Sequence, residues 1–182
     1  MANTTTEQFD RVIDSCRKVF MAKMNDYGTA WRILRPSSLT DQIYIKASRI
    51  RSIQEKGESR VNEGIQPEFT GIVNYSIMAL IQLKLGSAEE SHMDPAVAGN
   101  LFDTYAAESR DLMADKNYDY SEAWRQMRIS SLTDIILMKL LRIKQIENNN
   151  GITSISEGLD ANYMDIINYA VFALIMLEEN AF

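Results

Sequence analysis

The chain carries the same stretch of sequence twice. Residues 26–50 read DYGTAWRILRPSSLTDQIYIKASRI, and residues 119–143 read DYSEAWRQMRISSLTDIILMKLLRI. They align without a gap at an offset of 93, and 15 of the 25 positions are identical. A unit this long, present only twice, predicts duplication of one small domain and not a solenoid. The copies also retain charges that packing alone does not require: Asp26/Asp119, Arg32/Arg125, Asp41/Asp134, Lys46/Lys139 and Arg49/Arg142.

Apolar spacing predicts three helices in each copy. In the first copy they cover about residues 6–24, a helix with a capping-box-like start at 38–41 that runs to 56, and residues 67–85. In the second copy they cover about 95–116, a helix capped at 131–134 that ends at 148–151, and about 160–179. Strand-like alternation is absent. We therefore predict an all-α fold, a tandem duplication of a three-helix unit packed as a pseudo-twofold helical bundle.

The domain limits follow from the repeat. The first repeat covers residues 1–86, the linker 87–94 and the second repeat 95–182, and we expect the two to form one compact globule. Three helices give a thin core alone, so each copy would bury its apolar face against the other.

Composition narrows the classes of function. The single cysteine, Cys16, excludes a disulfide framework. The single histidine, His92, lies in the expected linker, which argues against histidine-based catalysis. The net charge of −6 argues against an extended nucleic-acid groove. The repeated stretches nevertheless carry +2 and +1, so the remaining residues carry −9. That distribution favours a small anionic partner, such as a nucleotide or another small phosphate ligand. No signal peptide or membrane-length apolar run is present, which predicts a cytoplasmic protein without a membrane partner.

The second predicted helix of each copy carries a retained pair of cations. Lys46 and Arg49, like Lys139 and Arg142, are three positions apart and share one helix face. They are candidate phosphate-binding residues. The alternative is a solvated cationic face, with Asp41 and Asp134 complementing the helix dipole.

The third predicted helix of each copy carries an asparagine inside an apolar run. Asn74 and Asn168 would be costly there without hydrogen bonds. They are candidate ligand-binding residues, and the alternative is an inter-helix hydrogen bond that fixes register. In the second copy Asp165 precedes Asn168 by three residues, which favours a functional role for that pair.

The Asp-Tyr turn is the third repeated element. Tyr27 and Tyr120 are candidate ligand contacts, although the turn could equally be a structural corner with Trp31 and Trp124 as core anchors. Acidic residues beside Lys and Arg suit Mg²⁺ with a phosphate. The candidate metal ligands are Asp26, Asp41, Glu63, Asp119, Asp134, Glu157 and Asp165, and the candidate catalytic residues are Asp119, Glu157 and Asp165. Phosphate loops and nucleophile elbows are absent from the sequence.

These motifs resemble a known family. Lys-x-x-Asp-Tyr-Gly/Ser-x-Ala-Trp, then Asp-x4-Lys-x2-Arg-Ile, then Glu-Gly and Asp-x2-Asn-Tyr-Ala look like the nucleotide modification associated domain 1 family of bacteria and phages, in two tandem copies. The resemblance implies a role around modified nucleotides. A looser likeness is to the all-α, MazG-like nucleotide pyrophosphohydrolases, although their paired Glu-x2-Glu is not found in the Asp41 or Asp134 helix. The copies depart from the pattern at Gly71, where the second copy has Asp165, and at Ser121, where the first copy has Gly28.

Three hypotheses follow. The first is binding, with Mg²⁺-dependent hydrolysis as the reaction if the protein is an enzyme, of a nucleotide or nucleoside phosphate. The second is a non-catalytic helical binding or scaffold module in which Asp134, Lys139 and Arg142 pair with one another. The third is that the first copy is a structural remnant and the second alone is active. Whether the chain also forms a homodimer is left open by the sequence.

Overall fold

The structure is a computed structural model that describes residues 4–57 and 64–180. Over those residues the chain forms α-helices and two short 3-10 helices, with no strand, which confirms the all-α prediction. The first copy comprises α1 (Thr5–Tyr27), η1 (Ala30–Ile33), α2 (Pro36–Lys56) and α3 (Gln66–Leu85). The second comprises α4 (Pro95–Tyr120), η2 (Ala123–Gln126), α5 (Ile129–Asn148) and α6 (Leu159–Glu179).

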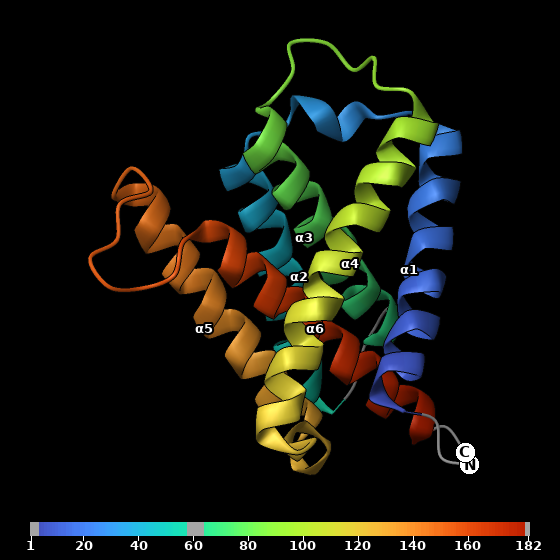
Figure 1. Cartoon of the computed structure of the whole chain (residues 1–182), viewed down its shortest axis with the longest axis vertical. Helices are drawn as coiled ribbons and strands as arrows, with labels where there is room; N and C mark the ends of the chain where they lie inside the picture. The colour runs from blue at the N-terminus through green and yellow to red at the C-terminus, as the bar shows by residue number, and fades with distance from the viewer. Residues whose placement is uncertain (1–3, 58–63, 181–182) are drawn as a thin grey trace.

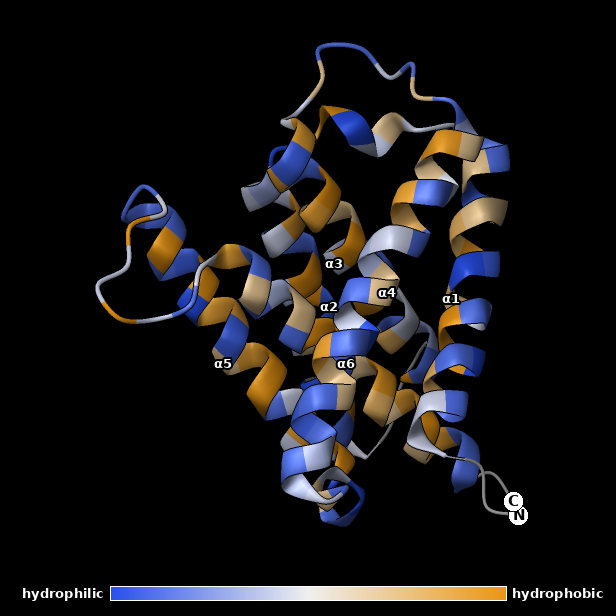
Figure 2. Ribbon diagram, in the orientation of Figure 1, coloured by the Kyte–Doolittle hydropathy of each residue, from blue (hydrophilic) through white to orange (hydrophobic). Residues whose placement is uncertain are grey.

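The third helices of the two copies form the centre of the bundle. α3 and α6 pack against each other, α2 flanks α3, α5 flanks α6, and α2 also contacts α5. α1 and α4 contact each other and cover one side, where α4 crosses in front of α6 (Figure 1). Hydrophobic residues gather on the inward faces of the helices, whereas the side of α4 that faces the viewer is largely hydrophilic (Figure 2). Burial is greatest in α3 and α6 because both are apolar around most of their circumference.

Three polar contacts between the copies have a reciprocal contact. In each, the residues equivalent to the bonded pair, 93 positions away, bond in the opposite sense. Such reciprocity is the mark of a twofold interface. The pairs are Asp10–Arg110 at 2.6 Å with Arg17–Asp103 at 2.7 Å, Asp41–Lys144 at 3.2 Å with Arg51–Asp134 at 3.7 Å, and Thr40–Glu147 at 2.7 Å with Gln54–Thr133 at 3.1 Å.

The predicted capping boxes of the second helices are wrong. α2 begins at Pro36 and α5 at Ile129, before the Ser-Ser-Leu-Thr-Asp segments, and neither start has a side-chain cap. Pro36 suits the first position of α2 because a proline there lacks only an N–H that the helix would leave unbonded. Thr40 and Thr133 instead lie inside their helices and bond the other copy.

The first helices are longer than predicted. α1 and α4 continue through the Asp-Tyr pair and end at Tyr27 and Tyr120. The next residue has positive φ in both copies, 64° at Gly28 and 49° at Ser121. The turn nevertheless differs between the copies, because Gly28 has ψ −149°, whereas Ser121 and Glu122 are both left-handed, with ψ 46° and 28°. In the part of the chain described here, the helices are too short or too polar for any of them to cross a membrane.

Candidate functional site

Each copy contains a cavity where its first helix, its 3-10 helix and its third helix meet. The first-copy cavity lies among α1, η1, α3 and Lys46 of α2, and has a volume of about 790 Å³. The second-copy cavity lies among α4, η2 and α6, and has a volume of about 260 Å³. Every residue that lines the second has its counterpart lining the first. The cavity therefore belongs to the repeat and is not an accident of one copy.

The two cavities share some residues and differ at others. The retained pairs are Lys23/Lys116, Tyr27/Tyr120, Ala30/Ala123, Trp31/Trp124, Asn74/Asn168 and Tyr75/Tyr169. The changed pairs are Phe20/Met113, Met24/Asn117, Leu34/Met127, Gly71/Asp165 and Met78/Phe172. All four predicted ligand-binding residues, namely Tyr27, Asn74, Tyr120 and Asn168, thus lie at the two cavities.

A buried carboxylate binds two lysines in the second copy. The Asp165 side chain is 6% exposed, and it accepts hydrogen bonds from Lys116 Nζ at 2.7 Å and Lys139 Nζ at 2.8 Å. Lys139 also lines a third cavity of about 650 Å³, the loop cavity, formed with Arg142, Glu157 and the loop before α6. The Lys139–Asp165 pair therefore lies between the second-copy cavity and the loop cavity.

The charge of Asp165 governs the titration of Lys116. Burial alone would lower the pKa of Lys116, but the hydrogen bond and the charge of Asp165 outweigh burial, and the pKa is raised. A lysine in an unfolded chain has a pKa of about 10.4. The ion pair therefore stabilises the fold fully below that pH, and its contribution is lost as pH rises through the higher pKa of the folded state.

A pH series of unfolding experiments measures this linkage. The free energy of unfolding of the wild type is expected to fall as pH rises above about 10.4. In Lys116→Met the decline should be shallower, because the titrating ammonium is absent. Urea titrations of both proteins across that range provide the comparison, and parallel curves would contradict the assignment.

In the first copy, the acid that pairs with the equivalent lysine lies one helical turn earlier. Gly71 replaces Asp165, and a Cβ at Gly71 would lie 2.7 Å from Cε of Lys46, so the lysine chain occupies the space of the missing side chain. Glu68, one helical turn earlier, bonds Lys46 at 3.5 Å and also binds Arg49. Lys23, the counterpart of Lys116, has no ion-pair partner among the residues described. No acidic side chain of the described segments lines the first-copy cavity.

The repeated asparagines are buried and incompletely bonded. Asn74 Nδ2 donates to the carbonyl oxygen of Cys16 at 3.1 Å, which confirms an inter-helix hydrogen bond, while its Oδ1 has no partner in the described structure. Asn168 has no partner for either Nδ2 or Oδ1 within the same residues, and is 5% exposed. Since buried polar atoms are normally bonded, these free atoms mark places where a ligand or water would bind.

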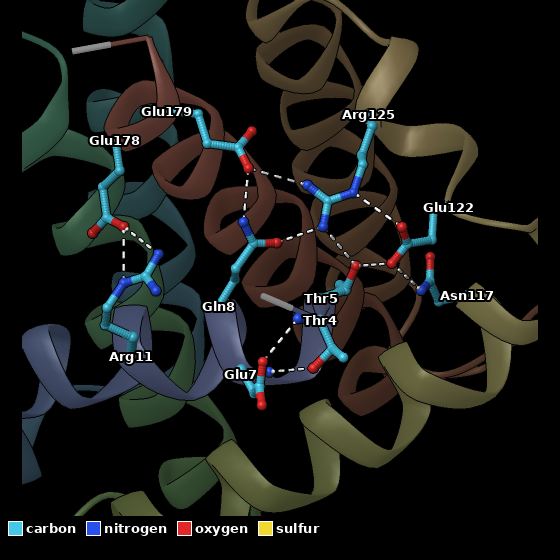
Figure 3. Close-up of polar contacts among 10 residues, drawn as sticks. All are labelled: Thr4, Thr5, Glu7, Gln8, Arg11, Asn117, Glu122, Arg125, Glu178 and Glu179. Carbon is cyan, nitrogen blue, oxygen red and sulfur yellow. Dashed lines mark hydrogen bonds and ion pairs between the residues drawn. The ribbon is translucent and has the colours of Figure 1, made fainter. Parts of the chain in front are cut away.

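Arg125 ties the wall of the second-copy cavity to the start of α1 (Figure 3). Its guanidinium carbon lies 4.4 Å from the ring centre of Trp124. The other face of that ring is covered by Phe172, which stacks at 4.3 Å and 3°. The guanidinium donates to side chains from three elements, namely Thr5, Gln8, Glu122 and Glu179. The retained arginine thus positions Trp124, while Arg32 in the first copy is buried against Gln82 and Gly86.

The remaining predicted residues do not line the first-copy or the second-copy cavity. Asp41 and Asp134 pair with Lys144 and Arg51 of the opposite copy, and so Asp134, Lys139 and Arg142 do not pair with one another. Asp26 and Asp119 are exposed. Glu157 and Arg142 line the loop cavity, and Glu63 lies outside the described residues.

The predicted metal ligands do not come together. Within residues 4–57 and 64–180, no three Asp, Glu, His or Cys side chains form a group that could hold a metal ion. Asp165 is already bonded to two ammonium groups, so its oxygens do not fit a divalent cation as they stand. Cys16 is buried, and burial raises the pKa of its thiol to about 12, which leaves it unreactive near neutral pH.

Comparisons with known proteins agree with the repeat. Curated proteins and solved structures gave no match to this chain. The sequence profile described as nucleotide modification associated domain 1 matches residues 23–83 and 116–177, one match in each copy and together more than half of the chain. The matches begin at the two cavity lysines, Lys23 and Lys116, and run through the helices that enclose the cavities. The chain belongs to the nucleotide modification associated domain 1 family, as two tandem copies.

Proposed function

We propose that the first-copy cavity binds a nucleotide or nucleoside phosphate. Membership of the family indicates a nucleotide-related role. The observation that carries the proposal is a cavity of about 790 Å³ that is lined by two lysines and by no described acid. That volume lies within the range of about 300–1,000 Å³ that is usual for small-molecule sites.

Lys23 and Lys46 are the groups that would hold phosphate. Lys23 is exposed at the mouth of the cavity without a described acidic partner, so its charge is available to an anion. Lys46 lies 3.5 Å from Glu68, but Glu68 is shared with Arg49 and does not line the cavity. A phosphate that bound both lysines would therefore meet positive charge without a competing carboxylate in its path.

The aromatic residues and Asn74 suit the base. The cavity is lined by Trp31, Tyr27 and Tyr75, and aromatic rings can stack on any of the nucleobases. Asn74 Nδ2 donates to the carbonyl oxygen of Cys16, so Oδ1 is the unpaired acceptor of this cavity-lining residue. An N–H of the base would satisfy this buried oxygen.

Binding by lysines requires no metal. Mg²⁺ and hydrolysis stay predictions, because the acids named for them are dispersed among the described residues. The scaffold alternative is favoured at Asp41 and Asp134, whose pairs join the copies, and at Lys139, which is paired with buried Asp165. Those residues stabilise the bundle under either hypothesis.

A charge-matched pair of variants tests the proposal. We expect nucleoside mono-, di- and triphosphates to raise the melting temperature. Lys23→Gln should weaken binding about tenfold or more, since a hydrogen bond to a charged group is worth about 1.5–3 kcal/mol. Lys18→Gln, an exposed lysine of α1 that does not line the cavity, is the control and should bind like wild type.

Fluorescence assigns binding to one copy. The chain has two tryptophans, so Trp124→Phe leaves Trp31 as the reporter of the first-copy cavity. Titration with and without Mg²⁺ separates lysine binding from metal-dependent binding. The proposal fails if no nucleotide changes the melting temperature, or if Lys18→Gln weakens binding as much as Lys23→Gln.

A further inference from the structure

We propose that the second-copy cavity is a separate site for an uncharged nucleobase with an imide edge, as in uracil and thymine. This inference does not depend on nucleotide binding by the first copy. It rests on the size, the charge and the unpaired polar atoms of the second-copy cavity, which has an equivalent in the first copy but differs from it in several lining residues.

Size and charge exclude a phosphate-bearing ligand from this cavity. Its volume of about 260 Å³ is a third of that of the first-copy cavity and suits a single heterocycle. Its two charged lining residues, Lys116 and Asp165, are bonded to each other at 2.7 Å and cancel. Lys139, which could hold phosphate in the first-copy arrangement, is bonded to the same carboxylate at 2.8 Å. The described lining is therefore neutral, and the one positive charge left over from two lysines and one carboxylate belongs to Lys139, which lines the loop cavity instead.

Three buried polar atoms at the cavity have no partner in the described structure: Asn168 Nδ2, Asn168 Oδ1 and Trp124 Nε1. Both residues are more than nine-tenths buried, with exposures of 5% and 6%. Since Arg125 and Phe172 cover the two faces of the Trp124 ring, the indole offers an N–H and not a stacking surface. These two residues of the lining therefore supply two unpaired donors and one unpaired acceptor.

That set is complementary in number and kind to an imide edge. A uracil-type base presents carbonyl, N–H and carbonyl, that is, two acceptors around one donor. Asn168 would accept from the ring N–H and donate to one carbonyl, and Trp124 would donate to the other. A base with a methyl group in place of N3–H would leave Asn168 Oδ1 unpaired, a loss that buried polar sites penalise strongly. Phe172 and Tyr169, whose rings meet edge to face at 6.4 Å, provide apolar contact for the base.

The first copy is the internal comparison. Asn74 Nδ2 donates to the carbonyl oxygen of Cys16, so the Asn74 amide has one unpaired atom, the acceptor Oδ1. In the second copy the residue equivalent to Cys16 is Ser109, whose carbonyl does not bond Asn168. Of the two equivalent asparagines, Asn168 alone therefore has both Nδ2 and Oδ1 unpaired within the described structure.

Fluorescence of Trp31→Phe, in which Trp124 is the remaining tryptophan, reports on this cavity directly. We expect uracil and 1-methyluracil, which keeps the imide edge, to change the signal saturably, and 1,3-dimethyluracil, whose N3–H is replaced by a methyl group, to bind about tenfold or more weakly. Asn168→Leu in the same background should abolish the uracil response. Asn74→Leu should leave it intact.

The melting temperature separates a binding role from a structural one. Asn168 has no bond to lose among the described residues, so Asn168→Leu should melt at or above the wild-type temperature. Equal binding of the three bases, no binding of any, or a marked drop in melting temperature for Asn168→Leu would each overturn the inference. Nucleotide binding reported by Trp31 is a different signal, so failure of one site is distinguishable from failure of the other.

Discussion

Replacing Asp165 by alanine is expected to lower the free energy of unfolding by about 3–5 kcal/mol, the range for breaking a buried ion pair by removing one partner. The cost arises from the groups left behind. Lys139, with a side chain 11% exposed, would keep its charge in the protein without the carboxylate that compensates for its lost hydration. Lys116 is 44% exposed and can turn to solvent, so it contributes less.

Urea unfolding of Asp165→Ala measures this effect. Asp160→Ala, an exposed acid on the same helix, provides the control for loss of one negative charge. The first copy also suggests a rescue, because it keeps an acid at Glu68, which corresponds to Asn162 of α6. Asn162→Glu added to Asp165→Gly reproduces that arrangement and should recover part of the loss. A change below about 1 kcal/mol for Asp165→Ala, as at an exposed pair, would show that the ion pair is not part of the fold.

Helix positions were predictable from the sequence, and helix ends less so. Apolar spacing reports which face is buried, so α3 and α6 appear clearly in it. A start such as that of α2 depends on the chain path before the helix. Pro36 suits it by its fixed φ, but α5 starts at the equivalent residue, Ile129, without a proline. The Ser-Ser-Leu-Thr-Asp segment resembles a cap locally, but its threonines are used between the copies.

The repeat indicated the cavity residues but not their roles. Asn74 and Asn168 were identified because an amide recurs inside an apolar run, and Tyr27 and Tyr120 because the Asp-Tyr turn recurs. Asp41 and Asp134 recur for a different reason, since a residue at a twofold interface is retained when its reciprocal contact is retained. Sequence pattern does not separate these causes, because both leave the same identities.

The two equivalent lysines of the second helices make different ion pairs, because the acid beside them lies at a different position in each copy. Lys46 and Lys139 are equivalent, yet one lies across Gly71 toward Glu68 and the other is bonded to Asp165. The sequence does show this difference: the first copy has its acid at Glu68 and the second at Asp165, and these positions are one turn apart on the same helix face. Glu68 was not among the predicted site residues, because its counterpart in the second copy is Asn162 and the acid is not retained.

Neither copy is expected to fold alone as a monomer. α3 and α6 supply the centre of the bundle to each other, and residues such as Ile77 and Ile167 have no exposed surface in the intact chain. Separating the copies would expose the apolar surfaces of both helices to water, at a cost of about 25 cal/mol per Å². A half of this size has little core to offset the entropy of ordering its chain.

Expression of residues 1–94 and 95–182 as separate chains tests this expectation. Circular dichroism should show no cooperative thermal transition for either half at concentrations where sedimentation finds a monomer, and mixing the halves should restore one. A monomeric half that melts cooperatively would contradict it. A half that folds only as a homodimer would agree with it, because α3 against α3, or α6 against α6, repeats the contact that the duplication placed inside one chain.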